Sequence, residues 1–210
     1  MKKYDIDENY FEKIDSPEKA YLLGLIYADG CNYTPTNTVT LCLQEQDKHI
    51  LEDIKELLHY NAPLKKIKPK KESHQISFVL TIHSKKISTD LTALGVMQNK
   101  TFKITFPDIN KDLFSHFIRG YFDGDGCIIT GKRMERVSFV GTDSFINAIQ
   151  DIFLEKLNLS KTVTYKRNKE KNISTCYYKG RHSCKKIRDY LYNESTIHFK
   201  RKYLKFFSLL

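Results

Sequence analysis

Two aspartates have the surroundings best suited to chemistry in this chain. Asp29 lies near the end of the apolar run AYLLGLIYADG, and Asp125 lies near the end of HFIRGYFDGDG, 96 residues later. Each run is too short to cross a bilayer, which takes about 20 residues. We therefore expect two buried helices, each ending at an acid.

Small residues spaced four apart give each expected helix one face without bulky side chains. These are Gly24 and Ala28 in the first run and Gly120 and Gly124 in the second. Positions four apart share a helix face, so two such faces can pack closer than the usual 8 to 10 Å or so between helix axes. The two runs are therefore predicted to pack against each other, with both acids at the same end.

The residues after each acid lead to two further expectations. Gly30 and Gly126 are predicted to end the helices in the left-handed conformation that glycine adopts readily. Cys31 and Cys127 occupy equivalent positions, and we expect both to be buried where a strand begins. The five cysteines form no Cys-x-x-Cys pair, which favours reduced thiols.

Two carboxylates at the negative ends of two helix dipoles repel each other and call for positive charge. A divalent cation with oxygen ligands would supply that charge. Mg²⁺ typically takes one or two carboxylates and completes its shell with water and phosphate oxygens. Asp29 and Asp125 are therefore predicted to bind Mg²⁺ or Mn²⁺.

Both runs resemble the LAGLIDADG motif of the homing endonucleases, and the two copies resemble the single-chain members of that family. The glycine at the third motif position is Gly24 or Gly120, and the acid at the eighth is Asp29 or Asp125. The resemblance implies that these acids bind the catalytic metals. The sixth position holds Asp123 in the second copy but Tyr27 in the first. This departure matters little for metal binding, because the sixth-position acid is not a metal ligand in the family.

The segments around the motifs also repeat. Residues 38–44 alternate as a half-buried strand should, a helix follows from Asp47, and the same succession recurs in the second half. We predict an α+β fold made of two αββαββα repeats, with an arm at 1–15, halves at 16–105 and 111–210, and a linker at 106–110. Each half would form a four-stranded antiparallel sheet with one face covered by helices. In the family the two open faces form a saddle on the DNA major groove.

The charge of the chain favours a polyanionic partner. The net charge is +10 and the pI is about 9.2. Residues 1–105 hold 15 Lys and Arg against 14 Asp and Glu, whereas residues 106–210 hold 20 against 11. We therefore expect the second half to bind phosphate more strongly.

Two kinds of DNA contact are predicted from position and side-chain type. Residues opposite the apolar face of the second strand would face base edges, and Gln and Arg suit bidentate contacts there. These candidates are Thr40, Gln44, Arg136 and Ser138. Basic residues at the hairpins are better suited to phosphate. These are Lys66, Lys68, Lys70, Lys132, Arg133, Lys166 and Arg167.

The resemblance also implies a lysine near the end of each half that activates or orients water. Lys100 follows a segment that is similar to the family's in the first half. In the second half the spacing of the preceding helix favours Lys200, whereas the Arg201-Lys202 pair is more similar to the family's ending. We choose Lys202.

The leading hypothesis is a monomeric, metal-dependent, site-specific double-strand DNA endonuclease of intron-homing type with a long, pseudo-palindromic or asymmetric target. The alternatives are a DNA-binding regulator on the same scaffold, as in relatives that have lost the acids, and an RNA-binding maturase that acts on intron RNA. No signal peptide is apparent. We expect no membrane association and a cytoplasmic, nucleoid-associated protein of a bacterium or phage-infected cell, with an organellar host as the other option.

Overall fold

The two halves repeat one order of helices and strands. The computed structural model describes residues 3–69, 75–98, 102–131, 135–166 and 172–208. The elements of the first half are α1 (Pro17–Asp29), β1 (Gly30–Tyr33), β2 (Thr38–Gln44), α2 (Lys48–Leu57), β3 (Lys65–Ile67), β4 (Ser77–His83) and α3 (Lys85–Ala93). Those of the second are α4 (Phe114–Asp125), β5 (Cys127–Ile129), β6 (Arg136–Gly141), α5 (Asp143–Leu157), β7 (Tyr165–Lys166), β8 (Ser174–Lys179) and α6 (Arg181–Tyr192). A further helix, α7 (Lys200–Phe207), which the repeat did not predict, follows α6.

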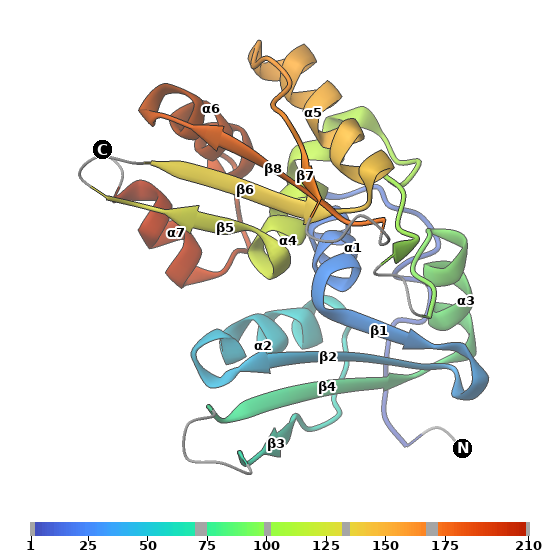
Figure 1. Ribbon diagram of the computed structural model, residues 1–210. Coiled ribbons are helices and arrows are strands. Elements are labelled where there is room, and N and C mark those ends of the chain that lie inside the picture. Colours follow the sequence, from blue (N-terminus) through green and yellow to red (C-terminus); the bar gives the residue numbers. More distant parts are fainter. Residues whose placement is uncertain (1–2, 70–74, 99–101, 132–134, 167–171, 209–210) are drawn as a thin grey trace.

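Each half builds one antiparallel sheet, in the orders β1-β2-β4-β3 and β5-β6-β8-β7. Figure 1 shows the sheets on either side of the α1 and α4 pair. In β2, buried Val39, Leu41 and Leu43 alternate with more exposed residues, and β6 follows the same pattern. The helices therefore cover one face of each sheet, which confirms the predicted α+β repeat.

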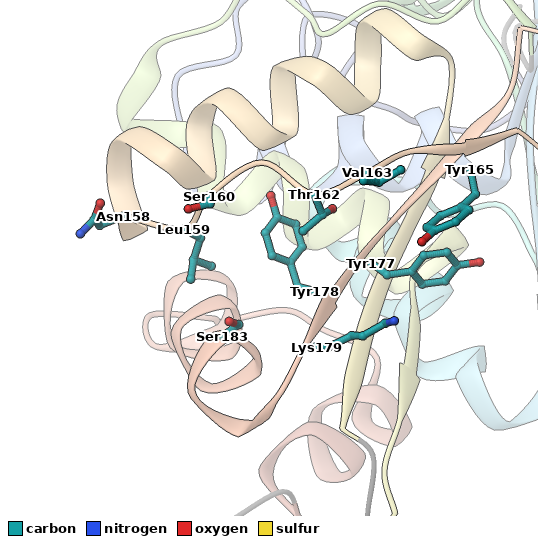
Figure 2. Close-up of a pocket in the computed structure, with 10 residues that line it drawn as sticks. All are labelled: Asn158, Leu159, Ser160, Thr162, Val163, Tyr165, Tyr177, Tyr178, Lys179 and Ser183. Carbon is teal, nitrogen blue, oxygen red and sulfur yellow. The ribbon is translucent and has the colours of Figure 1, made fainter.

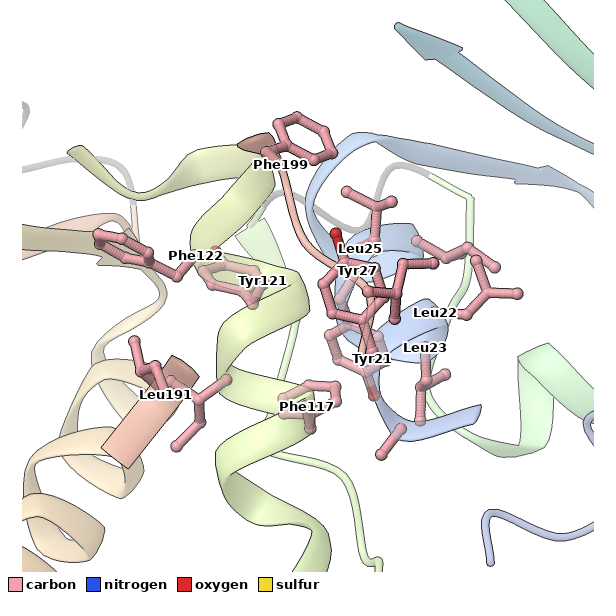
Figure 3. Packing of buried hydrophobic residues seen from close by; sticks show 14 of the residues in the cluster. Tyr21, Leu22, Leu23, Leu25, Tyr27, Phe117, Tyr121, Phe122, Leu191 and Phe199 are labelled. Atoms are coloured by element: carbon pink, nitrogen blue, oxygen red, sulfur yellow. The ribbon is translucent and has the colours of Figure 1, made fainter. Parts of the chain in front are cut away.

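Helices α1 and α4 pack against each other with almost no space between their backbones. A Cβ atom at Gly24 would lie 2.0 Å from the carbonyl oxygen of Phe117, and one at Gly120 would lie 2.0 Å from that of Tyr21. Apolar side chains flank this contact on both helices (Figure 3). The glycines thus permit a backbone approach that any side chain would prevent.

Gly30 and Gly126 adopt extended rather than left-handed backbone, so the predicted caps are wrong. Their φ angles are −79° and −73°. The chain passes from helix directly into strand at these positions. Space explains the glycines instead, because a Cβ at Gly30 would lie 2.7 Å from the Ile26 side chain and one at Gly126 2.0 Å from the Phe122 ring.

Cys31 and Cys127 are exposed, which also contradicts the prediction. In β1 the inward position belongs to Asn32, whose amide donates to the Ser88 and Val96 carbonyls at 3.0 Å each. Ile128 takes the inward position in β5. Because strand side chains alternate, both cysteines point to the open faces. The five cysteines are all free thiols.

The segment before α1 packs on the first half. Phe11 is 1% exposed, and Tyr10 and Ile14 are also buried. The amide of Asp7 donates to the Leu58 carbonyl at 2.8 Å, just after α2. This segment therefore covers part of the hydrophobic core of the first half.

The segment that follows the last repeat helix of each half contacts the opposite half. Arg201 Nε lies 2.8 Å from Asp47 Oδ2, at the start of α2. In the reverse direction, the Thr142 hydroxyl at the start of α5 donates to the Ile104 carbonyl at 2.5 Å. These crossed contacts join the halves beyond the α1 and α4 pair. No helix among the described residues is long and apolar enough to span a membrane.

Candidate active site between the two sheets

Asp29 and Asp125 are exposed at the C-terminal ends of α1 and α4. The strands that follow, β1 and β5, are edge strands of their sheets. Gly124 lies directly against the Asp29 carboxylate, since a Cβ there would be 2.9 Å from Asp29 Oδ2. The helix pair therefore brings Asp29 next to the end of α4, which carries Asp125.

The carboxylates of Asp29 and Asp125 both influence the pKa of one neighbouring group, the Tyr121 hydroxyl. Burial raises the pKa of the Tyr121 hydroxyl, and the charges of Asp125 and Asp29 raise it further. This hydroxyl donates to the Val140 carbonyl of β6 at 2.7 Å. A phenol shielded in this way stays protonated at neutral pH and is not a candidate base.

Lys202 is buried beside the C-terminal end of α4. Its ammonium donates to the carbonyls of Phe122 at 2.5 Å, Gly126 at 2.6 Å and Gly124 at 3.2 Å. An ammonium has three protons, so all of them are used. Burial lowers the pKa of Lys202 to about 8, and the nearby Arg201 lowers it while the carboxylates of Asp123, Asp29 and Asp125 raise it.

Lys202 therefore caps the C-terminal end of α4 and holds the turn that carries Asp125. Lys200, the alternative considered from spacing, is exposed at the start of α7.

Asp123 is a structural centre that the sequence analysis did not assign. Its carboxylate is fully buried and accepts from the hydroxyls of Tyr192 at 2.6 Å and Tyr21 at 2.9 Å and from the Phe199 amide at 2.8 Å. Burial raises its pKa despite these donors. The sequence signal for it was the acid at the sixth motif position, within a largely apolar helix run. Asp123 links α4 to α1 and to the segment that carries Lys202.

The predicted base readers lie on the open faces. Thr40 and Gln44 alternate with the buried residues of β2, and Arg136 and Ser138 do the same in β6. Gln44 is exposed, whereas the other three are half-buried. The Arg136 guanidinium lies 4.7 Å above the ring of Tyr177, a neighbour on β8 that we did not predict.

Three of the predicted phosphate contacts lie in the described part of the chain. Lys68 is exposed just after β3. Lys66 pairs in register with Phe78 of the helix-covered face, and its ammonium lies 3.8 Å from Glu45. Lys166 is 2.8 Å from Asp143. Lys65, which pairs with Val79, lies on the open face instead, but it was not among the predicted phosphate contacts.

Five further predicted residues lie outside the described residues. These are Lys70, Lys100, Lys132, Arg133 and Arg167.

The donor chemistry at Asp29 and Asp125 fits a hard divalent cation. Both are carboxylates that reach solvent, and glycine at 124 leaves room against Asp29 that a side chain would fill. Among the described residues no three His, Cys, Asp or Glu side chains cluster, so these two acids would provide the protein ligands. Mg²⁺ is commonly held by one or two carboxylates, with water and phosphate completing the shell.

Comparison with known proteins connects this arrangement to one family. Residues 113–202 match the LAGLIDADG-like domain. An uncharacterised protein of Methanocaldococcus jannaschii is 23% identical over 163 residues, which cover 73% of this chain. The matched region spans 59% of the length of that relative.

Solved structures share the fold over nearly the whole chain. The I-LtrWI LAGLIDADG homing endonuclease bound to target DNA matches with a TM-score of 0.59 at 12% identity and covers 96% of this chain and 90% of its own. The homing endonuclease I-WcaI bound to its DNA recognition sequence gives 0.59 at 16% identity, covering 97% and 91%. The N-terminal LAGLIDADG domain of DUF199/WhiA gives 0.56 at 16% identity, covering 89% of both.

The family match lies in the second half, while the shared fold extends over both halves and both motif helices. The whole chain therefore has the fold of the single-chain LAGLIDADG homing endonucleases, and its second half matches the LAGLIDADG-like domain.

Proposed function

We propose that this protein is a site-specific double-strand DNA endonuclease that hydrolyses phosphodiester bonds with divalent metal at Asp29 and Asp125. The observation that carries the proposal is the position of these acids. The α1 and α4 contact brings them to the junction of two sheets whose open faces carry exposed polar and basic side chains. A duplex lying on both faces would pass over the two acids.

The remaining groups have roles that follow from their surroundings. Bound Mg²⁺ or Mn²⁺ would supply an activated water and neutralise charge at the phosphate. Asp29 and Asp125 would hold the cation, while Gln44 and Arg136 would face base edges. The relatives crystallised on DNA support this use of the faces, and one of them, I-SmaMI, was bound to uncleaved DNA in the presence of calcium ions.

For Lys202 to orient a water molecule as predicted, one of its present hydrogen bonds must be replaced by a bond to that water. Its ammonium must give up one of its three carbonyl acceptors to reach a water molecule. In the arrangement described here it acts on Asp125 indirectly, by fixing the end of α4. Lys100, the proposed counterpart, remains a prediction from sequence.

The decisive experiment selects cut sites from a random or genomic duplex library in Mg²⁺. We expect site-specific double-strand cuts with the wild-type protein, and loss of cutting in Asp29→Asn and Asp125→Asn. Each variant removes a charge and keeps the shape of an exposed side chain, so the fold should survive. Binding of the selected duplex in Ca²⁺ serves as the control and should persist in both variants.

A non-catalytic DNA-binding regulator is the second candidate. The observation that favours it is the match to the LAGLIDADG domain of WhiA, whose TM-score of 0.56 is close to the 0.59 of the endonucleases. Tight, metal-independent duplex binding without any cut, equal in the wild type and both variants, would establish this function in place of the nuclease. The retention of both acids argues for cleavage.

A further inference from the structure

The second sheet ends in a pocket that the proposed cleavage site does not use. Strand β7 pairs only with Thr175 and Ser174, so the outer edge of β8 beyond them has no strand partner among the described residues. A pocket of about 520 Å³ opens at this edge, between β8, the start of α6 and the segment 158–165 (Figure 2).

At the corresponding edge of the first sheet, the equivalent segment is tied to the sheet and to the N-terminal segment by hydrogen bonds. His59 and Asn158 are equivalent positions, since each follows the second helix of its half with a positive φ, 48° and 51°. Just after His59, the hydroxyl of Tyr60 donates to the Thr81 carbonyl of β4 at 2.8 Å. The next residue, Asn61, receives the Asp5 amide at 3.0 Å from the N-terminal segment. In the second half Leu159 and Ser160 take these places and line the pocket beside β8.

The wall of the pocket contains a buried polar group without a partner. Tyr178 is 2% exposed, and its hydroxyl makes no hydrogen bond within the described structure. Figure 2 shows this hydroxyl directed towards Ser160 and Thr162. Leaving a buried hydroxyl unsatisfied is unfavourable, so a ligand that supplies a hydrogen-bond partner gains affinity by doing so.

The mouth of the pocket continues into an aromatic stack on the open face. The rings of Tyr165 and Tyr177 lie 5.5 Å apart at 59°, and the Arg136 guanidinium covers Tyr177 at 4.7 Å. Tyr165 ends the stack and is 54% exposed. Its outer surface is therefore available to another flat ring.

The charge of the residues that line the pocket favours an anionic ligand. None of the ten lining residues is acidic, and exposed Lys179 lies among them. The surrounding half of the chain carries 20 Lys and Arg against 11 Asp and Glu. Aromatic rings stacked with arginine beside a lysine are the means by which proteins bind unpaired bases and their phosphates.

We propose that this pocket binds an unpaired segment of nucleic acid, with one base stacked on Tyr165 and the adjoining nucleotide in the pocket beside the Tyr178 hydroxyl. A base within a duplex cannot stack on a tyrosine without leaving its own stack. The site is therefore distinct in its substrate from the duplex saddle. The proposal does not depend on cleavage by Asp29 and Asp125.

Fluorescence anisotropy with labelled single-stranded oligonucleotides of about 12 nucleotides tests it. Oligouridylate and oligothymidylate serve as the RNA and DNA probes. We expect Tyr165→Ala to weaken single-strand binding about 10-fold, because stacking on one aromatic ring contributes about this much per base. Tyr165→Phe keeps the ring and should bind like the wild type, and Tyr178→Phe should weaken binding less than Tyr165→Ala does.

A duplex of matched length provides the comparison. Duplex affinity should be the same for the wild type and Tyr165→Ala. Wild-type protein that binds neither single strand, or a Tyr165→Ala variant that binds them as tightly as Tyr165→Phe, would overturn the proposal. So would equal loss of single-strand and duplex binding, which would assign Tyr165 to the duplex interface. A preference for one probe over the other identifies RNA or DNA as the source of the base.

Discussion

At the scale of single residues, Lys202 holds together the end of the helix that carries Asp125. Replacement by methionine keeps the length of the side chain but leaves the carbonyls of Phe122, Gly124 and Gly126 without this donor. We expect Lys202→Met to lower the free energy of unfolding by about 1–3 kcal/mol. Urea denaturation measures this, with Lys200→Met on the exposed start of α7 as the matched control. Equal stability of the two variants would contradict the capping role.

His198 gives the molecule a dependence on acid pH. Its pKa is lowered from 6.5 to about 4, mainly by burial and then by the charges of Arg119, His49 and Lys200. Because the folded pKa is the lower one, the unfolded chain binds more protons between pH 6.5 and 4, and stability falls as the pH drops through this window.

The variant His198→Phe isolates the contribution of His198 to the pH dependence of stability. It keeps an aromatic ring stacked on Tyr203, whose ring centroid lies 4.3 Å from that of the imidazole in the wild type. With allowance for partial exposure, we expect His198 to contribute about 1 kcal/mol, or roughly 2–4 °C in Tm, to the loss between pH 7 and 4.5. Thermal unfolding at several pH values should show a shallower decline for the variant. Parallel curves would mean that other groups carry the acid sensitivity.

At the scale of elements, the contact between α1 and α4 depends on two glycines. A methyl group at Gly24 or Gly120 would lie 2.0 Å from a carbonyl oxygen of the opposite helix, and backbone cannot give way as a flexible side chain can. We expect Gly24→Ala and Gly120→Ala each to cost about 3 kcal/mol or more, against the gain of up to about 1 kcal/mol that alanine normally brings to a helix.

Chemical denaturation of both glycine variants beside Asn147→Ala tests this expectation. Asn147 is exposed on α5, so its replacement reports helix propensity alone. Separation of the helices would also displace Asp29 from the end of α4. The cutting activity of Gly24→Ala or Gly120→Ala should therefore fall by more than the decrease in the folded fraction of each variant explains. A stabilised Gly24→Ala would exclude the close helix contact.

At the scale of the whole molecule, crossed contacts make the two halves depend on each other. Asp47 of the first half is 3% exposed and is paired with Arg201, whose side chain is 43% exposed. Removing the arginine leaves a buried carboxylate without its cation, which costs more than losing an exposed pair. We expect Arg201→Ala to destabilise the protein by about 1–3 kcal/mol and to leave one cooperative transition.

A double-mutant cycle separates this charge effect from lost packing. Asp47→Asn combined with Arg201→Ala should recover part of the loss, because the uncompensated charge is gone. Lys205→Ala, on an exposed position of α7, is the surface control. Two separate transitions in Arg201→Ala would show instead that the halves are coupled mainly through this pair.

The sequence by itself determined the repeat, the secondary structure within each repeat and the positions of the two motif acids. These features are local, since the alternation of β2 and the four-residue spacing of Gly24 with Ala28 and of Gly120 with Gly124 are each legible within one element. The α+β class followed because the same local signals recur at a constant offset.

Only the tertiary structure decided what surrounds those acids. Asp123 meets Phe199, 76 residues away, and Lys202 meets the end of α4, 80 residues away from Phe122. The conformation of Gly30 and the exposure of Cys31 likewise depend on how the chain enters β1 after the helix. Local periodicity specifies which face of an element is apolar, but the partner of a buried polar group is chosen by packing between distant segments.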